Sequence, residues 1–319
     1  MSHAIVFSTS EKYVSCKSML PSKNKNSETA NFWLERFWFE LQPFYPQGKA
    51  QWLHYGLAAE IVCKPDESFN ISKALNTDAF LALRARASVE NIDVNIVALE
   101  ERRKKLLIAD MDSTIITSES LDQLAQLAGV GAAVEAITEC SIAGKMDFSE
   151  ALINRVKLLA GKPVELLKAV LDQVALNDGA VSLVQTMRAN DSKCYLVSGG
   201  FDFLLGHVSS LCGFHGYHGN HMLINENVIT GDVSRPILDR KAKAKYLTDY
   251  CTRLGIDISA TASIGDGAND LEMLSRSGMG VAFQGQRLLL DRIPLQLNYT
   301  NLLGLLYLQG YLAEEFVGA

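Results

Sequence analysis

Short apolar runs alternate with helical stripes of apolar residues along most of this chain. An apolar run of about four to eight residues bounded by polar residues is typical of a strand buried inside a parallel sheet. Runs of this kind lie at 106–109 and 194–197, and a shorter one lies at 262–264. Helical patterns separate these runs. The alternation predicts an α/β fold built on a doubly wound parallel sheet.

The N-terminal part of the chain carries a smaller alternation of its own. A run of charged residues at 100–105 follows it and is typical of a solvated linker. We therefore predict a small N-terminal α/β domain over 1–99 and a larger domain over 100–319. Within the first domain we expect strands at 3–8, 51–63 and 92–98 and helices at 28–41 and 70–87.

Two further segments interrupt the larger domain. Residues 118–178 carry only helical patterns, with apolar residues recurring at helical spacing. Because this segment directly follows the strand at 106–109, it can only lie above the edge of the sheet, where we expect it to act as a lid. Residues 213–238 are rich in turn-forming residues and short β runs, which predicts a hairpin.

The first strand of the larger domain ends in two acidic residues, Asp110 and Asp112. Side chains at i and i+2 of an extended segment point the same way, so both carboxylates enter one small volume at the carboxyl end of the strand. Open α/β sheets bind their ligands at that edge. Two close carboxylates repel, and a hard cation such as Mg²⁺ would compensate them. The alternative is an acidic turn with no chemistry.

The other two strand ends also deliver small or acidic polar clusters. Ser198-Gly199-Gly200-Phe201 follows the second strand, and Gly265-Asp266-Gly267-Ala268-Asn269-Asp270 follows the third. Glycines there let backbone N–H groups approach a bound anion without an intervening Cβ. A lysine-rich segment at 240–245 opens a predicted helix that runs to about residue 253. One of its lysines could reach a phosphate, although such a run is also typical of a solvated helix face.

Composition narrows the class of protein. The chain has 319 residues, a formal net charge of −6 and a pI near 5.6, which argues against a general nucleic-acid surface. The sequence contains no apolar stretch of the roughly eighteen residues that a membrane-spanning helix needs. The N-terminus lacks the layout of a secretory signal, and the six scattered cysteines suggest buried thiols. We therefore expect a cytoplasmic protein without a nucleic-acid or membrane partner.

Four motifs stand in order along the larger domain: Asp-Met-Asp-Ser-Thr at 110–114, Ser-Gly-Gly-Phe at 198–201, Lys243, and Gly-Asp-Gly-Ala-Asn-Asp at 265–270. Taken together, these motifs resemble the haloacid-dehalogenase-like superfamily and, within it, the phosphoserine phosphatases. The resemblance covers about residues 101–300 and includes the cap elements at 144–148 and 152–156. It implies a helical cap at 118–178, and the N-terminal domain is similar in length and position to an ACT-like regulatory domain. A structural or dimerisation domain that binds nothing is the alternative, and a homodimer stays open.

The resemblance also implies an activity, the Mg²⁺-dependent hydrolysis of O-phosphoserine to serine and phosphate, which is the last step of serine biosynthesis. Asp110 would be the nucleophile that forms an aspartyl-phosphate, and Asp112 the general acid and base. The implied Mg²⁺ ligands are the Asp110 carboxylate, the Asp112 backbone carbonyl and Asp266. The implied substrate-binding residues are Glu119, Arg155, Ser198, Gly199, Lys243 and Asn269.

Individual roles follow from the same resemblance. Lys243 is preferred over its neighbouring lysines because it lies 23 positions before Asp266. Glu119 would bind the substrate's ammonium group and Arg155 its carboxylate, because a forked guanidinium suits that group. Asp270 would orient Lys243 or a metal-bound water. The chain departs from the family by having Ile153 where a second arginine is common.

Four other functions are weaker alternatives. The nearest is a phosphatase or phosphotransferase of the same fold that acts on another small phosphate ester. Dehalogenation has no use for a leaving-group acid or for Mg²⁺, and a phosphate-driven ion pump needs membrane helices. A non-enzymatic sensor would be expected to lose an acid from the first or last motif. Here all four acids of those motifs are present, namely Asp110, Asp112, Asp266 and Asp270.

Overall fold

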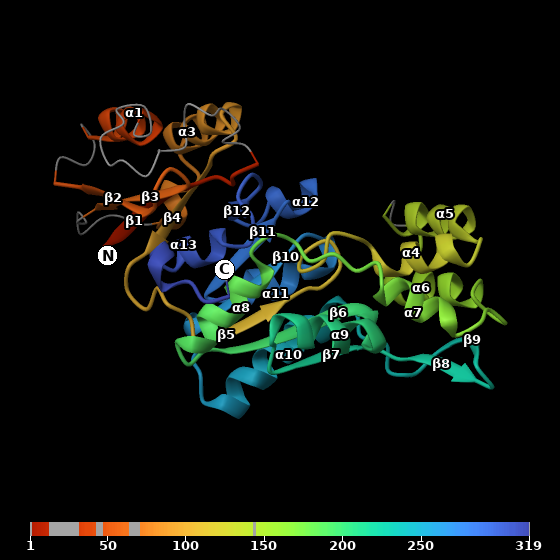
Figure 1. Ribbon diagram of the computed structural model, residues 1–319. Coiled ribbons are helices and arrows are strands. Elements are labelled where there is room, and N and C mark those ends of the chain that lie inside the picture. The colour runs from red at the N-terminus through yellow and green to blue at the C-terminus, as the bar shows by residue number, and fades with distance from the viewer. Residues whose placement is uncertain (1, 13–31, 43–46, 64–70, 143–144, 319) are drawn as a thin grey trace.

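The computed structural model describes residues 2–12, 32–42, 47–63, 71–142 and 145–318 (Figure 1). Residues 28–31 of the first predicted helix, and Gly144 of the cap element, lie outside the described residues. Two main sheets organise the chain, one antiparallel and one parallel. Among the described residues, no helix is both long and apolar enough to cross a membrane.

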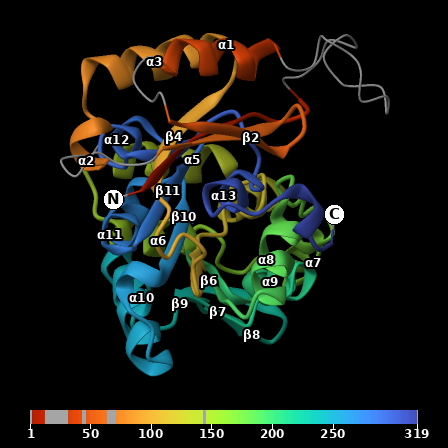
Figure 2. The same cartoon turned by 90° about the vertical axis from the view of Figure 1, so that its left-hand side faces the viewer.

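The N-terminal sheet is four-stranded and antiparallel. Helices α1 (Phe32–Leu41) and α3 (Asp78–Val89) cover one of its faces, and the short α2 is Ile71–Ala74 (Figure 2). Along the chain, these strands and helices succeed one another in the β-α-β-β-α-β order of a split βαβ unit. The strands in spatial order are β2 (Lys49–His54), β3 (Ala58–Cys63), β1 (His3–Ser8) and β4 (Asp93–Ala98).

Strand β1 is buried along its whole length because both faces of this sheet are covered. Ile5 and Phe7 pack with Phe37 of α1 in one apolar cluster. Ala4 and Val6 on the opposite face join the larger core that contains Tyr307. The N-terminal sheet therefore shares a core with the rest of the chain.

Two predicted elements of this region are wrong in their extent. The predicted strand at 51–63 is a hairpin of β2 and β3, and Gly56 in its turn has φ of +77°, a backbone conformation that side chains disfavour. The predicted helix at 70–87 is divided into α2 and α3. Thr77 caps α3 by accepting a hydrogen bond from the Phe80 N–H at 3.3 Å, which starts a new helix there.

The second sheet confirms the predicted α/β fold. Its strands all pair in parallel, and every residue of β5, at its centre, is fully buried. The spatial order of its six strands is β12 (Leu295–Leu297), β11 (Met279–Phe283), β10 (Thr261–Gly265), β5 (Leu106–Ala109), β6 (Lys193–Phe201) and β7 (Gly216–Asn220).

Helices cover both faces of this sheet. On one face, Leu106 and Ile108 of β5 pack with α10 (Arg240–Leu254) and α11 (Leu271–Arg276). On the other, Leu107 and Ala109 pack with α8 (Ala180–Ala189), α9 (Asp202–Cys212) and α13 (Gly304–Leu308). The remaining short helices are α12 (Arg287–Leu290) and the 3-10 turns Ile258–Ala260, Ala268–Asp270 and Ala313–Glu315.

Among the described residues between β5 and α8, four helices form an insert, which lies at the end of the molecule opposite the N-terminal sheet (Figure 1). A hairpin of β8 (Met222–Asn225) and β9 (Val228–Val233) reaches this insert. The Gly161 N–H donates to the Ile229 carbonyl at 2.8 Å, and the Ile229 N–H donates to the Lys162 carbonyl at 2.8 Å. The helices of the insert are α4 (Ser120–Leu127), α5 (Gly131–Ile142), α6 (Phe148–Lys157) and α7 (Glu165–Leu171).

Candidate active site

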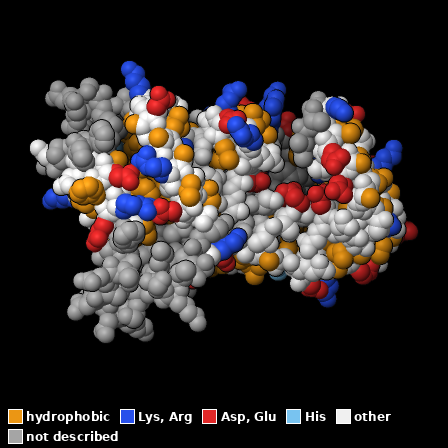
Figure 3. Space-filling model, turned by 90° about the horizontal axis from the view of Figure 1, so that it is seen from above, with side chains coloured by type: hydrophobic (Ala, Val, Ile, Leu, Met, Phe, Trp, Pro, Cys, Tyr) orange, Lys and Arg blue, Asp and Glu red, His pale blue; other side chains and the backbone are white. Residues whose placement is uncertain are grey.

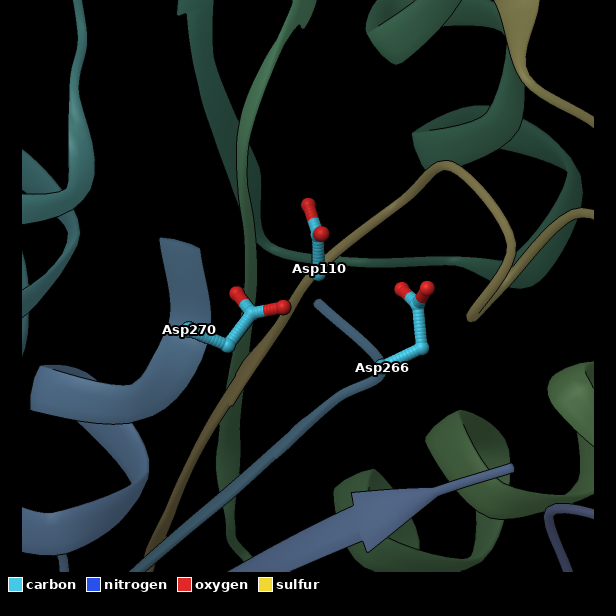
Figure 4. A group of neighbouring side chains, drawn as sticks. All are labelled: Asp110, Asp266 and Asp270. Carbon is cyan, nitrogen blue, oxygen red and sulfur yellow. The ribbon is translucent and has the colours of Figure 1, made fainter. Parts of the chain in front are cut away.

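Three carboxylates meet at the carboxyl edge of the parallel sheet (Figure 4). Asp110 directly follows β5, Asp266 directly follows β10, and Asp270 ends the 3-10 turn after it. One oxygen atom from each carboxylate lies within 4.8 Å of the other two. The parallel pairing of β5 with β10 brings them together, and the Asp110 N–H extends that ladder by donating to the Ile264 carbonyl at 3.0 Å.

Lys243 of α10 lies between two of these acids and is almost completely buried. Its Nζ is 2.8 Å from Asp110 Oδ1 and 2.7 Å from Asp270 Oδ1. Burial alone would lower the pKa of Lys243, but the charges of Asp110 and Asp270 raise that pKa above its ordinary value. Lys241 and Lys245 are exposed. Lys243 is therefore the lysine of this segment that the fold brings to the strand ends.

The acidic cluster holds more negative charge than one lysine neutralises. Burial and the neighbouring Asp110 raise the pKa of Asp266 to about 8 and that of Asp270 to about 7. Thr114 also donates to Asp266 Oδ1 at 3.0 Å, which fixes the orientation of that carboxylate. Clustered carboxylate oxygens are the ligands that hard divalent cations prefer. The residues present therefore fit a divalent cation.

Asp112 lies beside this cluster, and its carboxylate turns toward other partners. Oδ1 accepts the Ser120 N–H at 2.8 Å, and Oδ2 accepts the Ser198 hydroxyl at 3.4 Å. Burial, followed by the charges of Glu119 and Asp110, raises the pKa of Asp112 to about 7. A carboxyl group with a pKa near neutrality can both give and take a proton. The acidic cluster therefore contains the side chain of Asp270 and not that of Asp112. The metal ligand predicted from Asp112 is its backbone carbonyl, so that prediction does not depend on the direction of its carboxylate.

The Ser198–Gly200 segment brings backbone close to these acids. A Cβ on Gly200 would lie 2.6 Å from Asp112 Oδ2, and a Cβ on Gly199 would lie 2.6 Å from Cζ of Phe148 in the insert. At either position a Cβ would force the neighbouring side chain to shift, so glycine permits this close approach. Asn269 lies within the 3-10 turn Ala268–Asp270, between the two acids of that loop.

Glu119 and Arg155 both come from the insert side. Glu119 is the N-cap residue of α4 and accepts the Ser113 hydroxyl at 2.6 Å. Arg155 of α6 is half-buried and donates to Thr138 Oγ1 at 3.5 Å. Burial lowers the pKa of Arg155, while the charges of Asp122, Glu119 and Asp112 oppose that shift. The guanidinium therefore lies in the field of acids from both the insert and the strand end.

The sequence argument missed several polar residues at this edge. Ser113 and Thr114 stand inside the first motif, so their position next to the aspartates was a usable signal. Asp122 follows Glu119 by three residues, one helical turn along α4, and was also within reach of pattern analysis. Asn220, at the end of β7, carries no local pattern and becomes visible only in the structure.

The face of the molecule drawn in Figure 3 is hollowed and acidic. Seen from above, Asp and Glu side chains gather where the parallel sheet meets the insert (Figure 3). A separate cavity of about 580 Å³ lies between α3, β4 and the Asn298–Tyr299 segment, away from the strand ends. Arg84, which lines it, already donates to the Val94 and Pro294 carbonyls at 3.0 and 2.8 Å. The chemistry therefore concentrates at the acidic edge.

Comparison with known proteins shows to which protein family this chain belongs. Haloacid dehalogenase-like hydrolases match residues 107–275, and this chain belongs to that family. Phosphoserine phosphatase from Mycobacterium tuberculosis is 35% identical over 241 residues, which are 75% of this chain and 59% of that relative. The alignment thus takes in less than two thirds of the relative's length.

Two solved structures extend the comparison. A hydrolase of the same family from Salmonella enterica serovar Typhi is 26% identical, with a TM-score of 0.78, and 97% of this chain aligns with 98% of that one. A phosphoserine phosphatase described as a phospho-aspartyl intermediate analogue is 29% identical, with a TM-score of 0.61. Here 64% of this chain aligns with 98% of that chain.

Proposed function

We propose that this chain is a phosphoserine phosphatase that hydrolyses O-phosphoserine through an aspartyl-phosphate at Asp110. The observation that carries the proposal is the position of Asp110, which belongs to the acidic cluster, shares buried Lys243 with Asp270 and lies next to a carboxyl group with a raised pKa. The sequence identity between this chain and phosphoserine phosphatases supports the choice of O-phosphoserine as substrate.

The reaction has two displacements. Asp110 attacks phosphorus in line, so an Asp110–phosphorus bond forms while the bond to the serine oxygen breaks. Protonated Asp112 gives its proton to that leaving oxygen. Asp112 then takes a proton from the attacking water, which displaces the Asp110 carboxylate and releases inorganic phosphate. Such a double role suits a carboxyl group whose pKa lies near 7.

We assign the cation as Mg²⁺. Asp110, Asp266 and the Asp112 backbone carbonyl would hold it, with water completing the shell. Bound there, it would reduce the repulsion between the carboxylate nucleophile and a dianionic phosphate. The raised pKa values of Asp266 and Asp270 support this assignment, because burial and the charge of Asp110 disfavour their ionised forms and a bound cation would offset both effects.

Four residues would bind the phosphoryl group: Ser198, the Gly199 N–H, Lys243 and Asn269. Their donors would surround the position where the transition state spreads its negative charge. Asp270 orients Lys243, since its Oδ1 lies 2.7 Å from Nζ.

Specificity would come from the insert, which we propose acts as a cap. Phosphoserine carries an ammonium group and a carboxylate at its non-reacting end, so its pocket needs one acid and one base. Glu119 would bind the ammonium and Arg155 the carboxylate. The charges of Glu119 and Asp112 both act on Arg155. This supports one site that would bind the phosphoryl end and the amino-acid end of the substrate together.

The domain division of the chain is part of the same proposal. Residues 1–99 would form an ACT-like domain and 100–319 the phosphatase domain, with the cap at about 118–178 and the hairpin element at about 213–238. The antiparallel sheet with two helices on one face supports the first assignment.

The test is phosphate release from a panel of phosphoesters, with Mg²⁺ and with a chelator. We expect magnesium-dependent turnover in which phosphoserine exceeds the other esters by about tenfold or more, and no turnover by Asp110→Asn. Arg155→Ala should lose much more activity on phosphoserine than on a phosphoester without a carboxylate. Equal losses on both esters would overturn the substrate assignment, and full activity of Asp110→Asn would overturn the mechanism.

A further inference from the structure

Strand β6 departs from regular pairing at the residues that approach Asp112. Its register with β7 passes from Val197 opposite His218 to Phe201 opposite Asn220, so β6 spends two more residues than its partner over this stretch. Such a bulge removes ladder partners from the backbone of Ser198–Gly200. A buried carbonyl that loses its ladder partner needs another donor.

Asn220 supplies that donor. Asn220 is 2% exposed, and its Nδ2 donates to the Gly199 carbonyl at 2.8 Å. Its Oδ1 accepts the Leu238 N–H at 2.8 Å, which fixes which end of the amide faces Gly199. Nδ2 also lies 3.5 Å from the Leu238 carbonyl. The nitrogen and the oxygen of one amide group thus join the bulge to the segment that precedes α10.

The same peptide group determines where the Ser198 hydroxyl points. The Gly199 carbonyl and the Gly200 N–H belong to one planar peptide, so fixing the carbonyl also fixes the N–H. That N–H donates to Ser198 Oγ at 3.0 Å. Since Oγ accepts this bond, its own proton must point elsewhere, and the hydroxyl donates toward Asp112 Oδ2 at 3.4 Å. A phosphoryl oxygen in the site would receive the same proton.

We infer that Asn220 is a positioning residue that aims the Ser198 hydroxyl at the phosphoryl group, by holding the Gly199–Gly200 peptide. This inference rests on the proposed phosphatase function. It assigns Asn220 no contact with substrate: the residue acts through Ser198. Without the Asn220 amide the peptide is free to rotate, and the Gly200 N–H no longer orients Ser198 Oγ.

The test is a double-mutant cycle between Asn220→Ser and Ser198→Ala, assayed with phosphoserine and Mg²⁺. Serine is too short to reach both Gly199 and Leu238, so we expect kcat/KM to fall by about 10- to 100-fold. Inhibition by inorganic phosphate should weaken in parallel. In the Ser198→Ala background the same change should cost no more than about threefold, because two residues that act through one interaction are not additive.

Thr230→Val is the matched control for loosening of the hairpin. It removes the hydroxyl bonded to the Leu223 carbonyl at 3.0 Å and leaves Gly199 untouched, so kcat/KM should stay within about twofold of the wild type. Losses that add up in the cycle, or equal losses in Thr230→Val and Asn220→Ser, would overturn the inference.

Two further outcomes also decide. If Asn220→Ser does not fold, Asn220→Asp carries the same cycle, because it keeps the size and the acceptor for Leu238; failure of both to fold would make Asn220 a structural residue and overturn the inference. A wild-type chain that releases no phosphate from any ester would instead overturn the proposed function, which separates the two failures.

Discussion

The buried ion pair between Glu60 and Arg102 offers a quantitative test of how the N-terminal sheet is held. Glu60 lies on β3, Arg102 lies between β4 and β5, and Arg102 Nη1 is 2.6 Å from Glu60 Oε2. Their side chains are only 4% and 9% exposed. Arg102 also donates to the Leu308 carbonyl at 2.7 Å and to the Tyr307 carbonyl at 3.1 Å. The pair therefore connects the antiparallel sheet to α13.

Glu60→Gln removes one charge and leaves the guanidinium buried. Breaking a buried pair on one side costs about 3–5 kcal/mol of unfolding free energy. The two carbonyls that Arg102 keeps favour the lower end, about 3 kcal/mol. With a urea dependence of about 3 kcal/mol/M, the midpoint should fall by about 1 M. Replacing both residues by methionine should recover most of the loss, because no buried charge remains.

Urea unfolding followed by two probes measures this. All three tryptophans lie within the N-terminal 52 residues, so their fluorescence reports on that region, whereas far-ultraviolet circular dichroism reports on the whole chain. Because the N-terminal sheet shares a core with α13, both signals should shift together. Glu40→Gln is the control: its pair with Arg86 is exposed, and its loss should cost about 0–1 kcal/mol. Equal effects of the two substitutions, or a tryptophan transition that separates from the dichroism, would refute the reasoning.

Three shorter predictions concern the site. Lys243→Met should reduce kcat/KM by about a thousandfold, because Asp110 and Asp270 lose their buried cation. Lys241 is exposed, so Lys241→Met should keep kcat/KM within about twofold of the wild type. Comparable losses in the two variants would contradict the role assigned to Lys243. Asp266 has a folded-state pKa of about 8, above its ordinary value, so in chelator its stabilising contribution is full below pH 4 and disappears as pH rises through 8. Mg²⁺ should therefore raise the melting temperature more at pH 8 than at pH 6, and an equal rise at both would count against a cation bound at Asp266. Gly200→Ala should lose about 100-fold in kcat/KM with unchanged dichroism, because its Cβ would lie 2.6 Å from Asp112 Oδ2; retained activity would show that the carboxylate can move aside.

The local sequence pattern was enough to predict the candidate site residues that directly follow a buried strand. Asp110, Ser198 and Asp266 each follow an apolar run, and parallel pairing brings those runs to one edge. The helix predicted from the lysine-rich segment is confirmed as α10, and Asp239 caps it by accepting the Ala242 N–H at 2.9 Å. Two wrong boundaries had signals that were available in the sequence. Gly56 interrupts the apolar run at 51–63, and Thr77 precedes Asp78 as a usual N-cap residue does.

Contacts that depend on register or on distant chain segments left no such signal. Glu60 and Arg102 are 42 residues apart, and neither shows from its neighbours that it will be buried. Asn220 donates to the Gly199 carbonyl at the stretch where β6 bulges against β7. A bulge changes which backbone groups are unpaired without changing the hydrophobic pattern, so pattern analysis finds the acidic groups at the strand ends and misses the amide that bonds to Gly199. Residues of this second kind should therefore be sought among buried side-chain amides next to irregular strand ends, where a lost ladder bond creates a demand that the sequence does not display.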